Sequence, residues 1–177
     1  MIRKATIADL DAIAAIYDAV HTAEECGEMT IGWNRAIYPT RETAERAIRA
    51  EDMYVLEEDG CIAAAGLLNK VQVAEYALIP WEIAAEDDEV FVMHTLVVDP
   101  AKTRRGHAAA FVAYYHDLAR KLGCRTLRID TNARNAAARK MYAKLGFREA
   151  GAVPCVFNGL EGVQLVCLER EVWEVEE

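Results

Sequence analysis

The side chains best suited to binding an anion are concentrated in residues 99–148. This segment contains 12 Lys and Arg against three Asp and Glu, although the 177-residue chain has a net charge of −9. Within it, the run from Lys102 to Ala110 contains Gly106 and opens a predicted helix. The first N–H groups of a helix lack intrahelical partners and carry the positive end of its dipole. Together with the nearby cations, they suit a bound polyphosphate.

Tyr142 is a candidate proton donor. An unperturbed tyrosine has a pKa near 10, so it stays protonated at neutral pH and can protonate a leaving group. The residue shares a predicted helix face with Ala138, Met141 and Leu145, which by periodicity alone is typical of a core aromatic. The residues themselves leave both interpretations open.

His94 is a candidate proton acceptor. Alternation along the apolar run 90–98 predicts that it shares a strand face with Val92, Leu96 and Val98. An unperturbed pKa near 6.5 would let the ring take a proton from an ammonium group through a water molecule. A histidine in an apolar strand is also often a hydrogen-bonded core residue. The acidic connector before the strand, residues 82–89, contains Glu82, Glu86 and Glu89, which are alternative bases or simply part of a solvated loop.

The elements that would position these groups alternate between strands and helices. Apolar patterns and turn residues predict strands over residues 2–6, 53–57, 61–68, 90–98, 125–131, 147–151 and 162–170. One helix follows the capping-box residues Thr6 and Asp9, a second begins at Pro39–Thr40, and two more span residues 106–122 and 135–145. The order β-α-α-β-β-β-α-β-α-β-β predicts one domain over residues 1–177, of the α/β (α+β) class.

Composition argues against several classes of protein. No segment reaches about 18 consecutive apolar residues, so no membrane span is expected, and the acidic amphipathic N-terminus is unlike a secretory signal. A cytoplasmic protein is the default expectation. The five cysteines are widely spaced, with no C-x-x-C pair, so we expect reduced thiols and no metal. A sequence pI of about 5.0 argues against nucleic acid as a partner.

Four motifs in register resemble the Gcn5-related N-acetyltransferase (GNAT) family. They are LVVDP at residues 96–100, RRGHA at 104–108, Asn135, and MYAKLGF at 141–147. The resemblance also extends to the order of elements along the whole chain. It implies the GNAT fold, a mixed and mostly antiparallel sheet of about seven strands flanked by about four helices, with two strands splayed apart at the cofactor site.

The resemblance implies acetyl-CoA as cosubstrate and no metal. Strand residues Leu96, Val97 and Val98 would pair with the pantetheine arm as if it were an added strand. The pyrophosphate would lie on the loop and helix start, at Arg104, Arg105, Gly106, His107, Ala108 and Ala109. Thr103 stands where the family has Arg or Gln, and Arg104 where Gly is more usual, so the side-chain contacts of this loop are the least secure part of the match.

The family pattern also implies roles for the polar side chains. Asn135 would hydrogen-bond the pantetheine arm, cap its own helix, or do both. Tyr142 would lie beside the cofactor sulfur and protonate the departing thiolate. His94 resembles the strand histidines that arylalkylamine N-acetyltransferases use as bases. Members of the family are often dimers, so a homodimer is an expectation of the same kind.

The acceptor is expected to lie near the first two helices, the variable part of the family. Trp33 and Tyr38, with Pro39, could form an apolar wall there, or be ordinary core residues. Residues 1–89 contain seven Lys and Arg against 19 Asp and Glu, which favours a cationic amine. We therefore expect direct acetyl transfer to a primary amine of a small molecule or peptide.

Two other functions fit part of the sequence. A non-catalytic domain that binds or senses acyl-CoA would keep the Gly106 loop but would need neither Tyr142 nor His94. A nucleotide-binding module is disfavoured because neither G-x-x-x-x-G-K-[ST] nor G-x-G-x-x-G occurs in the chain.

Overall fold

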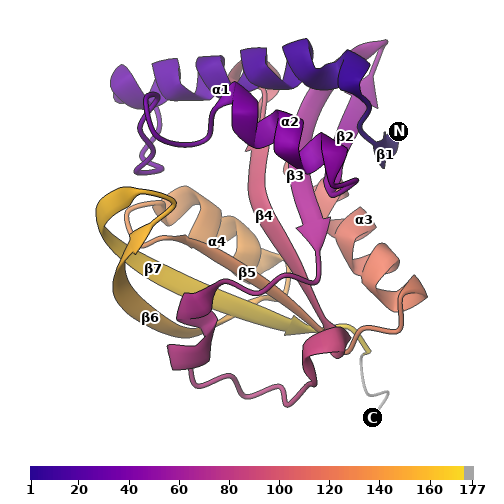
Figure 1. Ribbon diagram of the computed structural model, residues 1–177, viewed down its shortest axis with the longest axis vertical. Helices are drawn as coiled ribbons and strands as arrows, with labels where there is room; N and C mark the ends of the chain where they lie inside the picture. The colour runs from indigo at the N-terminus through magenta and orange to yellow at the C-terminus, as the bar shows by residue number, and fades with distance from the viewer. Residues whose placement is uncertain (174–177) are drawn as a thin grey trace.

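The chain folds around one sheet in the computed structural model, which describes residues 1–173 (Figure 1). Within these residues, seven strands and four α-helices follow the predicted order. The strands are β1 (Ile2–Lys4), β2 (Met53–Glu58), β3 (Cys61–Asn69), β4 (Val90–Val98), β5 (Thr126–Asn132), β6 (Arg148–Phe157) and β7 (Leu160–Glu171). The helices are α1 (Leu10–Glu25), α2 (Arg41–Arg49), α3 (His107–Lys121) and α4 (Ala136–Lys144), with 3₁₀ helices η1 (Ile7–Asp9), η2 (Ala74–Leu78), η3 (Asp87–Glu89) and η4 (Pro100–Lys102).

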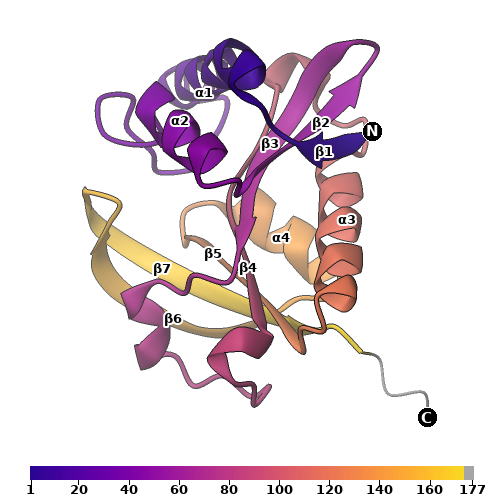
Figure 2. The ribbon, with the colours of Figure 1, turned by 45° about the vertical axis from the view of Figure 1, so that its right-hand side comes forward.

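The sheet is mixed and mostly antiparallel, as expected. Its strand order is β1-β2-β3-β4-β5-β7-β6, and only the β4–β5 pair is parallel. Helices α1 and α2 cover one face of the sheet, and α3 and α4 cover the other (Figure 2). Residues of the central strands therefore enter three apolar clusters, of which the third packs β4 and β7 against η2 and Ile79. None of the helices in the described part of the chain is long and apolar enough to cross a membrane.

Helix α2 illustrates how local sequence sets an element. The Thr40 side chain caps its N-terminus by accepting a hydrogen bond from the amide of Thr43. The predicted apolar residues Ala44, Ala47 and Ile48 are all buried against the sheet. Polar residues occupy the outer face of the helix, so its orientation on the sheet follows from its amphipathic pattern.

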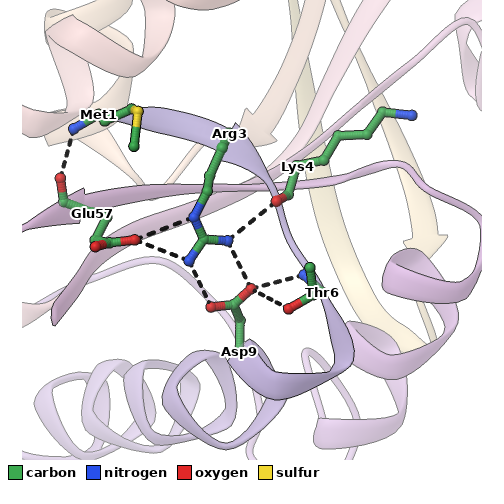
Figure 3. A network of polar contacts seen from close by, with 6 residues as sticks. All are labelled: Met1, Arg3, Lys4, Thr6, Asp9 and Glu57. Carbon is green, nitrogen blue, oxygen red and sulfur yellow. Dashed lines mark hydrogen bonds and ion pairs between the residues drawn. The ribbon is translucent and has the colours of Figure 1, made fainter. Parts of the chain in front are cut away.

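An ion-pair network fixes the start of the chain (Figure 3). The Arg3 guanidinium donates two 2.9 Å hydrogen bonds to Asp9 and also reaches Glu57 on β2. Asp9 completes the predicted capping box by accepting a 2.7 Å hydrogen bond from the amide of Thr6. Arg3 lowers the pKa of Asp9 to about 2 despite its burial. Strand β1, the start of α1 and β2 are thereby held together.

Strand β6 is longer than the pattern predicts. The expected strand ended at Gly151, whereas pairing with β7 continues to Phe157. Pro154 lies within the added stretch, and proline normally argues against a strand. Because β6 is an edge strand, one side of its backbone has no partner and Pro154 is tolerated there. The β6–β7 hairpin consequently reaches the loop between α1 and α2 (Figure 1).

Strands β4 and β5 splay apart as the family resemblance implies. Their parallel pairing runs from Val90↔Thr126 to Met93↔Ile129 and ends there. Strand β4 continues to Val98 beside β3, while β5 continues to Asn132 beside β7. Beyond Met93, the edge of β4 on its β5 side therefore has no strand partner among the described residues.

A bulge in β4 corrects the predicted side-chain alternation. Thr95 has φ 52°, and the pairing with β3 shifts from Ala65↔Val97 to Leu67↔His94. As a result, Leu96 and Val98 pack in the core beneath α3 and α4, whereas His94 lies on the opposite face. The expectation that His94 shares a face with Leu96 and Val98 was wrong, because alternation holds only while the strand stays regular.

Candidate functional site

A cavity of about 810 Å³ passes through the opening between β4 and β5. We call its two parts the donor end and the acceptor end. The donor end is lined by Leu96, Val98, Thr103, Arg104, Ala108, Asn135, Ala138, Met141 and Tyr142. The acceptor end is lined by residues of six segments: the loop before α2, α2 itself, β3 with the segment after it, β4, β5 and the β6–β7 turn. They include Trp33, Tyr38, Arg46, Asn69, His94, Asp130, Phe157 and Asn158.

The donor end begins at the N-terminus of α3. Gly106 is the N-cap with φ 84°, and no side chain caps the helix. The first helical hydrogen bond runs from the amide of Ala110 to the carbonyl of Gly106, so the three amides before it have no partner in the described part of the chain. Arg104 has φ 65°, which is the conformation that glycine adopts most easily. Glycine, the more usual residue of the family at this position, adopts this conformation without strain, whereas Arg104 does not.

The side chains of Arg105 and His107 do not line the cavity. Arg105 is paired with Glu58 at 3.4 Å on the outside. The His107 side chain is buried, and its Nε2 lies 3.4 Å from the same carboxylate. Gly106 and Ala109 also contribute no surface to the cavity wall, unlike Arg104 and Ala108. The side chain of Arg105 ties this loop to the end of β2, whereas His107 Nε2 is buried without a hydrogen-bond partner among the described residues.

Leu96, Val97 and Val98 lie along the unpaired edge of β4, as the resemblance implies. The Val97 side chain is buried on the α1 side, so its contribution to the cavity comes from its backbone. Asn135 caps α4, since its Oδ1 accepts a 3.1 Å hydrogen bond from the amide of Ala138. It also lines the cavity, so capping does not remove it from the site.

Tyr142 belongs to both the core and the site. It is 6% exposed and its ring packs edge-on against Phe147. Its hydroxyl has no hydrogen-bond partner among the described residues, yet it is not fully enclosed as the unpartnered Tyr17 hydroxyl is. The cavity is therefore the side on which the Tyr142 hydroxyl remains accessible. Burial, with a contribution from Asp130, raises the pKa of Tyr142 well above its ordinary value, so the group stays protonated at neutral pH.

His94 is oriented by two acceptors. Its Nε2 lies 3.1 Å from Oδ1 of Asn69 and 3.2 Å from the carbonyl of Val71, so Nε2 carries the proton. Asn69 in turn donates a 2.9 Å hydrogen bond to Asp52. Nδ1 is left without a partner among the described residues and holds a free lone pair. Burial lowers the pKa of His94, although the Val71 carbonyl and Asp52 oppose this.

Asp130 is a site residue that the sequence analysis missed. It is the first residue of β5 beyond the last pair with β4, and His94 holds the matching position on β4. The Tyr76 hydroxyl donates a 2.8 Å hydrogen bond to Oδ2 of Asp130. Burial raises the pKa of Asp130 to about 6. A signal was available, because Asp130 is one of three acidic residues in the basic segment 99–148.

Trp33 and Tyr38 both line the acceptor end, where their rings meet edge to face at 6.1 Å. The Tyr38 hydroxyl bonds to the hydroxyl of Thr95, the bulge residue of β4. Gly32 approaches β5 so closely that a Cβ there would lie 2.4 Å from Nδ2 of Asn132. The loop before α2 therefore closes over the open end of the splayed strands.

The acidic connector does not contribute to the site. Glu82, Glu86 and Glu89 are absent from the cavity wall. The backbone amide of Glu82 donates a 2.8 Å hydrogen bond to the buried Glu169, and the Glu82 side chain pairs with Arg148. Glu86 and Glu89 form the capping box of η3. Their suggested role as alternative bases is therefore not supported. Within residues 1–173, no cluster of three metal-ligating side chains occurs either.

The sequence model of the acetyltransferase (GNAT) family matches residues 14–147. The chain belongs to this family of acetyltransferases. No curated protein sequence matches it. The matched region contains all four motifs and the whole lining of the cavity except residues 157–165, at the end of β6, in the β6–β7 turn and in the first half of β7.

Several solved structures share the GNAT fold of this protein. A GNAT-family acetyltransferase from Streptococcus agalactiae superposes with a TM-score of 0.79 at 22% identity, over 97% of this chain and 94% of the other. An N-acetyltransferase from Staphylococcus aureus Mu50 gives 0.69 at 22% identity over 98% of both chains. YncA from Salmonella typhimurium, solved with its cofactor acetyl-CoA, superposes with a TM-score of 0.69 at 20% identity. The match covers 100% of this chain and 96% of YncA. At these identities the similarity concerns the fold.

Proposed function

We propose that this GNAT protein transfers an acetyl group directly from acetyl-CoA to a primary amine of a small molecule or peptide. The observation that carries the proposal is the single cavity that joins the uncapped N-terminus of α3 to the acceptor end, with Tyr142 and His94 on its wall. An acyl donor bound at one end and an amine bound at the other would meet at the opening between β4 and β5.

The residues of the donor end fit coenzyme A. Three unpaired amides at the start of α3, beside Arg104, suit a pyrophosphate. The free edge of β4 beyond Met93 suits the amide groups of a pantetheine arm. Asn135 stands at the start of α4 on the same wall. YncA, which shares this fold, is solved with acetyl-CoA, and this supports the same donor here.

His94 and Tyr142 can move the two protons that the transfer requires. Nδ1 of His94 takes a proton from the acceptor ammonium through a water molecule, and the free amine then attacks the thioester carbonyl. A backbone amide near Leu96 stabilises the oxyanion. Tyr142 gives its proton to the departing thiolate, and its raised pKa keeps that proton available until charge develops on the sulfur. No covalent enzyme intermediate is needed.

Binding and turnover can be tested separately. Acetyl-CoA well above micromolar concentration should raise the melting temperature, whereas ATP should not. Release of free thiol should then depend on an added amine. Stabilisation by ATP alone would overturn the donor assignment. Stabilisation by acetyl-CoA without thiol release for any amine in a broad panel would indicate a non-catalytic acyl-CoA-binding domain.

A further inference from the structure

Arg46 differs from the other cations of the N-terminal half. Among the seven Lys and Arg of residues 1–89, six have a hydrogen bond or an ion pair with a protein group. These six are Arg3, Lys4, Arg35, Arg41, Arg49 and Lys70. Arg46 has neither within the described residues, and it lines the acceptor end of the cavity. An arginine left unpaired in a region so rich in carboxylates is available to a ligand.

The position of Arg46 on α2 explains why it is unpaired. Thr43, Arg46, Ala47 and Ala50 recur at helical spacing, and all four line the cavity. Arg41 and Arg49 of the same helix point elsewhere, where they pair with Asp11 and Glu45 on the surface. Arg46 is therefore an exposed residue at the acceptor end, and its charge also lies within electrostatic range of Glu42, one turn earlier on the same helix.

A negative charge lies on the same wall. Asp130 offers Oδ1 to the cavity, since only Oδ2 is engaged by the Tyr76 hydroxyl. The Tyr38 hydroxyl lies within electrostatic range of both charges. Burial raises the pKa of Tyr38 and its bond to Thr95 lowers it, while Asp130 raises it further and Arg46 lowers it. A cation and an anion therefore both lie near Tyr38 on the wall of the acceptor end.

We propose that the acceptor is a small zwitterionic amine, an amino acid whose carboxylate binds Arg46 and whose ammonium group lies at Asp130. Guanidinium and carboxylate form a planar pair of hydrogen bonds, which fixes the orientation of the bound molecule. The apolar face of Trp33 is left for the side chain of the acceptor. Simple arylalkylamines and polyamines have no group for Arg46. The inference rests on the proposed acetyl transfer and names its acceptor.

The reaction balances on this arrangement. The ammonium at Asp130 loses one proton to His94, and the new amide C–N bond forms as the thioester C–S bond breaks. The thiolate takes a proton from Tyr142, the second proton lost by the nitrogen restores the Tyr142 hydroxyl, and His94 releases its proton to solvent. The products are an N-acetyl amino acid and coenzyme A. Acetylation converts the positively charged ammonium group of the acceptor into a neutral amide. The product is therefore no longer attracted to Asp130, and its release is favoured.

The test compares amino acids with their carboxamides, which keep the amine and side chain but lack the carboxylate. The wild-type protein should acetylate the acids with a kcat/KM at least about 30-fold higher than the amides. Arg46→Gln should lower kcat/KM for the acids by about 30-fold or more and change that for the amides less than about threefold. Arg49→Gln, on the same helix but facing outward, is the matched control and should change neither.

Binding provides a readout that does not depend on turnover. With coenzyme A present, amino acids should raise the melting temperature of the wild-type protein and of Arg49→Gln, and not of Arg46→Gln. That pattern without thiol release would support the acceptor class and overturn the proposed transfer. Equal use of acids and amides by the wild type, or equal losses for both in Arg46→Gln, would overturn the zwitterion assignment and leave acetyl transfer intact.

Discussion

The donor end and the acceptor end of the cavity are built in different ways. The donor end comes from one continuous stretch, residues 96–142, and relies on backbone groups at the edge of β4 and the start of α3. The acceptor end gathers side chains from six distant segments, among them Arg46 of α2, His94 of β4 and Asp130 of β5. Backbone groups can bind a donor without depending on which side chains are present, whereas selecting one acceptor requires specific side chains.

Replacing Tyr142 should have the largest effect, because it acts where the two ends meet. Tyr142→Phe removes the proposed acid and should lower kcat by about 10²-fold to 10³-fold, equivalent to about 3–4 kcal/mol. The affinity for acetyl-CoA should change little. Tyr17→Phe removes another buried, unpartnered hydroxyl outside the cavity and should leave kcat unchanged. Full activity of Tyr142→Phe in a thiol-release assay would show that another group acts as the general acid.

The buried negative charge of Asp130 at the acceptor end should lower the free energy of unfolding. Its pKa is raised from 3.8 to about 6, so folding favours the protonated form and wild-type stability falls as pH rises through this interval. Asp130→Asn should therefore be about 1–3 kcal/mol more stable than wild type at pH 7.5. The difference should vanish below about pH 4, and acceptor binding should weaken.

Urea denaturation at the two pH values measures this directly. A gain that is equal at pH 4 and pH 7.5 would mean that the charge of Asp130 is not its source.

Alanine substitutions of Gly32 and Gly27 distinguish the effect of backbone strain in the loop from the effect of a changed cavity shape. Both have positive φ, and a methyl group at either should cost about 1–2 kcal/mol. Only at Gly32 would the methyl displace Asn132, because nothing lies within 4 Å of a Cβ at Gly27. Gly32→Ala should therefore raise KM for the acceptor several-fold without changing the Kd for coenzyme A, and Gly27→Ala should change neither. A change in coenzyme A binding would show that the two ends are coupled.

Arg104 should give the smallest effect, and it tests the donor end. Arg104→Gly and Arg104→Ala both remove the guanidinium, but only glycine relieves the backbone at φ 65°. Chemical denaturation should find Arg104→Gly more stable than Arg104→Ala by about 1 kcal/mol. Both variants should weaken coenzyme A binding equally. Equal stability of the two would argue that this loop adopts another conformation in solution.

Local patterns predicted most of the fold, and tertiary contacts explain the errors. Strand β4 was placed correctly at 90–98, yet the bulge at Thr95 moved His94 to the other face. Strand β6 was predicted to end at Gly151, because Pro154 fits a strand only at the edge of a sheet, and the position in the sheet is set by the tertiary structure. Asp130 was overlooked although it is one of three acids in the basic segment 99–148, because the sequence does not show that it lies beside Tyr76 and the cavity.

The sequence by itself predicted the elements, the family and the residues of the donor end, because these depend on periodicity, capping and a motif within about fifty neighbouring residues. Only the tertiary structure decided the acceptor end. Whether Arg46 faces solvent or the cavity, which nitrogen of His94 is free, and whether Asp130 keeps its charge all depend on contacts between segments far apart in the chain. Burial and pairing set the chemistry of these groups, and neither is encoded near them in the sequence.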